Sequence, residues 1–281
     1  MSGGERVCLV TGGAGGIGRA ITESLAGRGD RVAVLDVDER AAAEVARNLP
    51  SAEGTHHLGL GCDLRSETSV SAAFDTAERE LGGLHILVNS GGVREIVDVV
   101  RISVAQWREV IDVNLTGTFL TCREFAVRVA RLGDTAPRAI VNIASVAGLV
   151  GIKNRPAYSA SKHGVIGLSK NLSTDLARYG IRVNVIAPGT IRTPMTEGYF
   201  ADEGFVSALS ALVPLGASGT VGDVAAAVDF LTGEGSGFVT GAVLTVDGGW
   251  SAEKGYSVDP GSAYFAAANG TPAPGTRRAV P

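Results

Sequence analysis

Residues 6–18 have the sequence Arg-Val-Cys-Leu-Val-Thr-Gly-Gly-Ala-Gly-Gly-Ile-Gly, and this stretch decides the fold class. The apolar run at 6–10 predicts a buried strand. The residues after it predict a helix with one face formed by Ile17, Ala20, Ile21, Ser24 and Leu25. Glycines between strand and helix allow a tight turn, and they let the backbone approach a phosphate held by the helix N-terminus. An ordinary glycine-rich turn is the alternative, but strand before and helix after is the context that a dinucleotide site needs.

A second predicted strand, residues 31–36, ends at Asp36, 18 residues beyond Gly18. In a dinucleotide fold an acid at this place accepts hydrogen bonds from the adenine ribose and disfavours a 2′-phosphate. No Lys or Arg lies in the glycine loop or beside Asp36, and Arg40 is the nearest downstream cation. These features favour NAD over NADP, and a solvated acid at a strand end is the alternative interpretation.

Tyr158 and Lys162 lie one helical turn apart in residues 157–162, Ala-Tyr-Ser-Ala-Ser-Lys. This spacing puts the phenol and the ammonium on one helix face, with Cβ atoms roughly 5–6 Å apart. A cation that close favours the phenolate and lowers a tyrosine pKa that is otherwise near ~10. We therefore expect Tyr158 to exchange a proton near neutral pH, although helices also carry such pairs by chance.

Predicted strands alternate with predicted helices along the chain. Strands near 31–36, 57–62, 84–89, 138–144, 181–187 and 241–246 complete seven with the first. The helices between them include 39–48, 68–81, 104–132 and 158–179. This alternation predicts an α/β fold, a doubly wound (Rossmann) single domain whose seven-stranded parallel sheet has helices on both faces. Ligands of such sheets bind at the carboxyl ends of the strands.

Together these residues resemble the short-chain dehydrogenase/reductase family, whose motif Thr-Gly-x-x-x-Gly-x-Gly fits residues 11–18. The resemblance covers about 6–250. It implies that Ser145 hydrogen-bonds the substrate oxygen and that Lys162 holds the nicotinamide ribose, while Asn114 helps hold a proton-relay water. The implied catalytic set is Asn114, Ser145, Tyr158 and Lys162. The implied cofactor-binding set is Gly12, Gly16, Ile17, Gly18, Asp36, Asp63, Leu64, Asn89, Tyr158, Lys162, Pro188, Gly189, Ile191 and Thr193.

One motif departs from the family pattern. Where the family commonly has Asn-Asn-Ala-Gly, this chain has Asn-Ser-Gly-Gly at residues 89–92. We expect Ser90 to remove an amide that often braces the sheet and Gly91 to add backbone freedom. Local rigidity is then in doubt, whereas cofactor binding is not.

The resemblance implies an NAD(H)-dependent oxidoreductase that interconverts a secondary alcohol and a ketone, with Tyr158 as general acid/base. One alternative is a 3-oxoacyl carrier-protein reductase using NADPH, and another is a non-catalytic NAD-binding sensor. Residues 193–219 are where the family carries its substrate lid. Lys153 and Arg155 could meet an anionic substrate, although solvated surface charge is the simpler interpretation.

Composition agrees with an enzyme acting on small alcohol or carbonyl substrates. The net charge is −4 and Arg277-Arg278 is an isolated pair, so nucleic acid is not expected as a partner. The histidines and the three cysteines lack metal-ligand spacing, and no 18-residue apolar run or signal peptide is present. We expect a cytoplasmic protein, a homotetramer by family resemblance, with a domain at 1–250 and a partly disordered extension at 251–281.

Overall fold

The computed structural model describes residues 6–51 and 56–252. The chain as far as Ser251 forms one compact unit by its contacts. The predicted extension at 251–281 therefore falls almost wholly outside the described residues.

Seven parallel strands form one sheet within the described residues, in the order β3-β2-β1-β4-β5-β6-β7. Their ends lie within two residues of the predicted ranges, so the predicted fold class is confirmed. The strands are β1 Val7–Thr11, β2 Arg31–Asp36, β3 Leu58–Gly61, β4 Ile86–Asn89, β5 Arg138–Ile143, β6 Ile181–Pro188 and β7 Val243–Val246.

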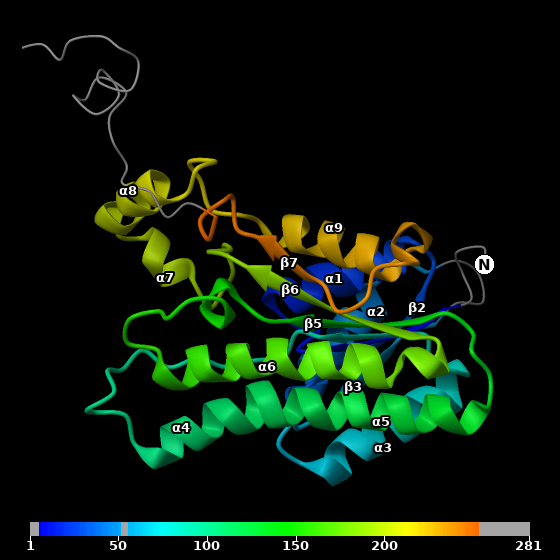
Figure 1. Ribbon diagram of the computed structural model, residues 1–281. Helices are drawn as coiled ribbons and strands as arrows, with labels where there is room; N and C mark the ends of the chain where they lie inside the picture. The colour runs from blue at the N-terminus through cyan, green and yellow to red at the C-terminus, as the bar shows by residue number, and fades with distance from the viewer. Residues whose placement is uncertain (1–5, 52–55, 253–281) are drawn as a thin grey trace, which may run out of the picture. The chain divides into compact units, whose positions relative to one another are not determined.

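Helices cover both faces of this sheet (Figure 1). On one face lie α1 Gly16–Gly27, α2 Glu39–Asn48 and α9 Val221–Thr232; on the other lie α3 Glu67–Leu81, α5 Gly117–Leu132 and α6 Pro156–Asp175. The described residues also contain α4 Val104–Ile111, which packs on α6, and then α7 Glu197–Phe200 and α8 Glu203–Leu212. Single 3₁₀ turns span Val146–Gly148, Ala177–Tyr179 and Glu234–Ser236.

Strand β1 shows why the sheet is buried on both sides. Its side chains alternate, so Val7 and Leu9 pack with α3 and α5 while Cys8 and Val10 pack with α1 and α9. All four side chains are fully buried. A strand covered on both faces has a continuous apolar run instead of an alternating one, and parallel strands joined by helices give this arrangement.

The predicted helix at 104–132 is wrong in one respect, because a π-helical turn interrupts it at Asp112–Thr116. Within this turn the Asn114 carbonyl accepts a hydrogen bond from the Thr118 hydroxyl at 2.7 Å. The Asn114 side chain is buried and bonded to another loop. Such turns inside helices often occur at functional sites.

The strand order reverses between β1 and β4, and this is where a doubly wound sheet forms a crevice. The loops after β1 and β4 part there. Thr11 joins them, because its hydroxyl accepts the N–H groups of Ser90 at 3.2 Å and Gly91 at 3.1 Å.

A buried polar network braces the centre of the sheet. The Asn89 amide donates to the Asn142 side chain at 2.8 Å and accepts from the Thr121 hydroxyl at 2.7 Å, and Asn142 in turn donates to Ser169 at 2.8 Å. These bonds connect β4, β5, α5 and α6. These hydrogen bonds hold the centre of the sheet together without an amide at Ser90. The predicted loss of local rigidity therefore does not follow.

No helix in the described ranges is both long enough and apolar enough to cross a bilayer. No group of three or more His, Cys, Asp or Glu side chains gathers there as a metal site either. Burial raises the pKa of the Cys62 and Cys122 thiols to about 12.

Two phenylalanines of α5 test the core. Phe125 is fully buried, whereas Phe119 on the same helix is 42% exposed. We expect Phe125→Ala to lower the free energy of unfolding by about 3–5 kcal/mol, because it leaves a cavity that the core cannot close. Phe119→Ala is the matched control and should change it far less. Chemical denaturation measures both, and equal losses would contradict this assignment of the core.

Candidate active site

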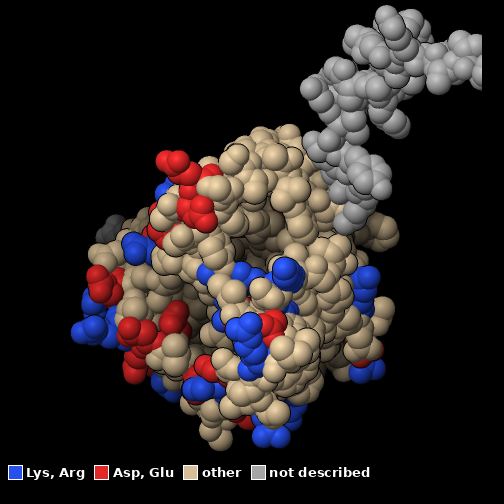
Figure 2. Space-filling model, turned by 90° about the vertical axis from the view of Figure 1, so that its left-hand side faces the viewer, with Lys and Arg blue, Asp and Glu red and all other residues tan. Residues whose placement is uncertain are grey.

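A cleft of about 1020 Å³ runs along the carboxyl edge of the sheet. Figure 2 shows this face of the molecule as a hollow with Lys and Arg side chains gathered beside it. Asp36 and Asp63 line one end of the cleft, the glycine loop lines its middle, and Ser145 and Tyr158 line the other end beside α7 and α8. A cleft of this extent suits a dinucleotide with a substrate next to it.

The glycine loop needs its glycines for two different reasons. A Cβ on Gly18 would lie 2.1 Å from the Gly12 carbonyl oxygen, and one on Gly12 would lie 2.6 Å from Gly91 Cα. At Gly15 a Cβ would meet nothing within 4 Å. Gly15 is also the N-cap of α1, with no side chain capping the helix. The helix therefore presents its first N–H groups to the cleft, which fits the phosphates of a dinucleotide.

Asp36 closes the end of the cleft where β2 stops. One carboxylate oxygen accepts from the Ala14 N–H and the other from the Asp38 N–H, both at 3.2 Å. These two bonds hold the carboxylate in place at the cleft wall. The position fits the predicted contact with the adenine ribose.

Asp63 also lines this end, but Arg65 engages its carboxylate. Arg65 donates to the two oxygens at 2.9 and 2.8 Å, and these bonds keep the pKa of Asp63 below its ordinary value. Leu64 fills the space beside two glycines, since a Cβ on either Gly91 or Gly117 would lie 2.7 Å from a Leu64 carbon. Gly91 thus makes room for Leu64 where the family usually has alanine.

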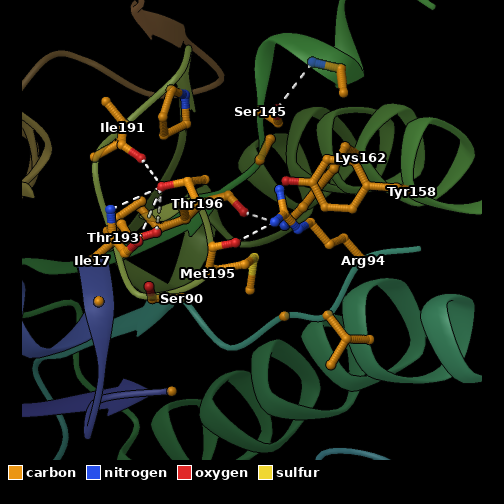
Figure 3. A pocket seen from close by; sticks show the side chains of 18 of the residues that line it. Ile17, Ser90, Arg94, Ser145, Tyr158, Lys162, Ile191, Thr193, Met195 and Thr196 are labelled. Atoms are coloured by element: carbon orange, nitrogen blue, oxygen red, sulfur yellow. Dashed lines mark hydrogen bonds between the residues drawn. The ribbon is translucent and has the colours of Figure 1, made fainter. Parts of the chain in front are cut away.

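Tyr158, Ser145 and Lys162 come together at the far end of the cleft (Figure 3). Burial raises the pKa of Tyr158, and a hydrogen bond from Ser145 together with the charges of Arg155 and Arg94 opposes this rise. The pKa of Tyr158 is therefore raised on balance, whereas the spacing of Tyr158 and Lys162 alone predicted a lowered one. The ammonium lies 5.6 Å from the centre of the Tyr158 ring, and it points to the Ile143 carbonyl at 2.9 Å.

Lys162 is almost completely buried, and burial lowers its pKa to about 8. No carboxylate pairs with it among the residues that the structure describes. An ammonium held by one carbonyl can still donate further hydrogen bonds. This leaves Lys162 able to bind the ribose hydroxyls of a nicotinamide cofactor.

Two residues predicted at the site lie behind the cleft wall. Asn114 holds the Val93 peptide from both sides, accepting its N–H at 2.8 Å and donating to its carbonyl at 2.9 Å. Asn89 is buried in the sheet network described above, and its side chain is not part of the cleft lining. Both asparagines position backbone that does face the cleft.

The remaining predicted residues lie at the end of β6 and in the segment that follows it. A Cβ on Gly189 would lie 2.9 Å from Asp247 Cα, so this glycine lets β6 and β7 approach at their ends. The Thr193 hydroxyl lies 3.1 Å from that of Thr196, which donates to the Ile191 carbonyl at 2.6 Å. Pro188, Gly189, Ile191 and Thr193 all line the cleft.

Sequence reasoning missed Glu95. Its Oε1 accepts the N–H groups of Ala157 at 2.8 Å and Tyr158 at 3.1 Å, and so caps the helix that carries Tyr158. Arg155, the N-cap residue itself, makes no side-chain cap. Glu95 precedes Ala157 by 62 residues, so no local capping pattern could have revealed it.

Residues 12–251 match the protein family described as Enoyl-(Acyl carrier protein) reductase. Cis-4-hydroxycyclohexanecarboxylate dehydrogenase of Sinomonas cyclohexanicum is 41% identical, over 88% of this chain and 97% of that protein. The chain belongs to the short-chain dehydrogenase/reductase family. D-threitol dehydrogenase of Mycolicibacterium smegmatis is a further relative, 38% identical over 88% of this chain and 93% of its own length.

Solved structures agree with this family membership. 4-Hydroxyisoleucine dehydrogenase complexed with NADH has a TM-score of 0.82 and 32% identity, covering 89% of this chain and all of that one. A mouse relative named 3-oxoacyl-[acyl-carrier-protein] reductase is 38% identical, and another similar structure holds NADP. This short-chain dehydrogenase/reductase is thus an oxidoreductase of a family that uses nicotinamide cofactors, and both cofactors occur among its relatives.

Lys162 gives this short-chain dehydrogenase/reductase a measurable pH signature. Its folded pKa of about 8 lies below the ordinary 10.5, so between these values the unfolded chain binds more protons. The free energy of unfolding therefore rises with pH across this window. We expect Lys162→Met to raise the melting temperature below pH 8, by roughly 2–4 °C per kcal/mol recovered. This increase in melting temperature should become smaller as pH rises toward 10.5.

Lys170→Met is the matched control, because Lys170 is exposed on the same helix. Thermal unfolding of the three proteins from pH 7 to pH 10.5 measures the effect. An increase in melting temperature that does not change with pH, or that Lys170→Met also produces, would contradict the assignment of Lys162 as a buried ammonium.

Proposed function

We propose that this protein transfers a hydride between NAD(H) and a secondary alcohol or ketone, with Tyr158 as general acid/base. The observation that carries the proposal is the meeting of Ser145, Tyr158 and Lys162 at one end of the cleft whose middle is the glycine loop. All four members of the family's catalytic set are present in order, which opposes a non-catalytic sensor.

Each residue has a distinct task in the proposed reaction. The bound nicotinamide supplies the hydride acceptor or donor. Tyr158 takes the alcohol proton during oxidation and returns it during reduction. Ser145 donates a hydrogen bond to the substrate oxygen, where negative charge develops. Lys162 binds the nicotinamide ribose, and Asn114 holds Val93 and through it the wall beside Lys162.

Asp36 supports NAD as the cofactor. Its carboxylate is fixed at the adenine end of the cleft, where a 2′-phosphate would meet a like charge. Arg65, the cation that lines this end, is already paired with Asp63. A homotetramer stays a prediction from the family resemblance, and a cytoplasmic location stays a prediction from the sequence composition.

A 3-oxoacyl carrier-protein reductase is the second candidate, because relatives carry that name. Such enzymes usually prefer NADPH and have a basic residue in the glycine loop. Residues 11–18 of this chain contain none. Asp36 and the neutral loop therefore favour the first candidate.

Tyr158→Phe tests the proposed general acid/base. We expect kcat to fall by about 10²-fold or more, because no other group at this position can transfer the proton. NADH affinity, measured by fluorescence titration, should stay nearly unchanged. Tyr179→Phe is the control, since Tyr179 lies outside the cleft lining. Retained turnover in Tyr158→Phe would remove this residue from the proposed role.

Asp36 can be tested with both cofactors. Steady-state oxidation of NADH and NADPH against ketones and 3-oxoacyl thioesters should show a preference for NADH with the ketones. We expect Asp36→Ser to reduce the NADH:NADPH ratio of kcat/KM on the order of 10-fold, because a like-charge contact is removed. Asp38→Asn is a matched control, since Asp38 caps α2 and does not line the cleft. NADPH-driven reduction confined to thioesters would instead establish the second candidate.

A further inference from the structure

Two arginines stand together at the substrate end of the cleft. Arg94 lies in the loop after β4, Arg155 directly precedes α6, and both are half-buried in the cleft lining. Neither forms an ion pair with any residue that the structure describes. Other arginines do, including Arg128 with three carboxylates and Arg138 with one. The chain therefore leaves two positive charges without a counter-charge at this place.

Neutral groups of the lid hold this pair in position. The Arg94 guanidinium lies 4.7 Å from the centre of the Tyr199 ring and donates to the Met195 carbonyl. Figure 3 shows the Arg94 side chain reaching toward Met195, with a dashed line joining the two. Arg155 lies 6.0 Å from the same ring and donates to the Tyr199 hydroxyl. Each guanidinium keeps further N–H groups available for a ligand.

Two positive charges that lie close together repel each other unless an anion binds between them. Burial and the charge of Arg155 both lower the pKa of Arg94. The nearest acids do not compensate, because Glu95 caps α6 and Glu109 is exposed at the cleft edge without an ion pair to either arginine. A bound oxyanion would remove this repulsion.

Arg94 and Arg155 lie at the end of the cleft that contains Tyr158. Both guanidiniums are close enough to Tyr158 to act on its charge. The phosphates of a dinucleotide are expected elsewhere, at the N-terminus of α1. The anion that would bind to Arg94 and Arg155 is thus part of the substrate and not of the cofactor.

We propose that Arg94 and Arg155 bind the carboxylate of an oxo acid or hydroxy acid substrate, whose carbonyl or carbinol carbon lies at Tyr158. This inference rests on the proposed function and adds the substrate class. A carboxylate accepts the parallel N–H groups of a guanidinium in one plane. Beside the pair, Phe205, Leu209 and Leu212 line the cleft and suit a compact apolar carbon frame.

Binding of the substrate carboxylate would also affect the segment that carries Tyr199. Arg94 and Arg155 come from the two loops beside the site, and Tyr199 comes from α7. An anion between the arginines joins all three segments through Tyr199. Closure of such a lid excludes water from the reacting carbon.

The test compares acids with their own esters. Straight-chain oxo acids that differ in the separation of carbonyl and carboxyl carbons are each paired with the methyl ester, under NADH. We expect the wild type to favour the best acid over its ester by about 10–100-fold in kcat/KM, the usual effect of hydrogen bonds to a charged group.

Substitution of the arginines should remove this preference. We expect Arg94→Gln and Arg155→Gln each to reduce the acid:ester ratio by about 10-fold or more, mainly through KM for the acid. Arg94→Lys should restore part of it. Arg178→Gln is the matched control, because Arg178 lies over the Tyr179 ring at 4.8 Å and outside the cleft lining. Its ratio should equal that of the wild type.

The outcomes separate this inference from the proposed function. Reduction of esters as fast as acids, with a ratio that no arginine variant changes, would overturn the carboxylate site and leave the oxidoreductase in place. Preference for an oxoalkyl phosphate over the matched acid would overturn carboxylate as the ligand. If the arginine variants do not fold, competitive inhibition of the wild type by simple carboxylates, but not by the matched alcohols, provides the same test. Absence of turnover with every carbonyl compound would count against the proposed function itself.

Discussion

Thr11 is the constraint on which the site depends, because its hydroxyl accepts two N–H groups from the loop after β4. This contact keeps the glycine loop and residues 90–95 at one separation, and Gly12 and Gly91 allow their backbones to meet there. The same loop is then connected to α6, which carries Tyr158, by two contacts. Val93 is held by Asn114, and Glu95 caps α6 just before Tyr158. The proposed phosphate site and the proposed proton-transfer site are thus positioned by one short segment.

The candidate site holds ionisable side chains in surroundings that destabilise their charged forms. Lys162 is buried beside a carbonyl instead of a carboxylate, and burial raises the pKa of Tyr158. Arg94 and Arg155 lie together without an acidic partner among the described residues. Several arginines elsewhere in the described chain are paired with acids, as Arg128 is with three of them. Unpaired, desolvated charge is concentrated where ligands are expected, which is the usual relation between stability and function in enzymes.

Sequence patterns predicted the strands well and the tertiary contacts poorly. Strand ends were within two residues because a buried parallel strand is a short apolar run bounded by turn residues. The π-helical turn at 112–116 was missed, since it depends on Asn114 bonding to Val93 from another segment. The Tyr158 pKa was expected to fall, but it is raised on balance, because burial outweighs the hydrogen bond and the positive charges beside it. Helix spacing gives the distance between two side chains on one face, but not their burial or the direction in which an ammonium points.

The sequence by itself determined the fold class, the glycine loop, the acid at the end of β2 and the identities of Ser145, Tyr158 and Lys162. Ser145 was assigned by the resemblance to the family, and the other features are local, because they rest on periodicity, glycine conformations and short spacings along the chain. The tertiary structure alone decided that Glu95 caps the catalytic helix, that Asn89 belongs to the sheet network, and that Arg94 meets Arg155 at Tyr199. Each of these contacts joins residues more than thirty positions apart, and only packing of the complete sheet and its helices brings such residues together.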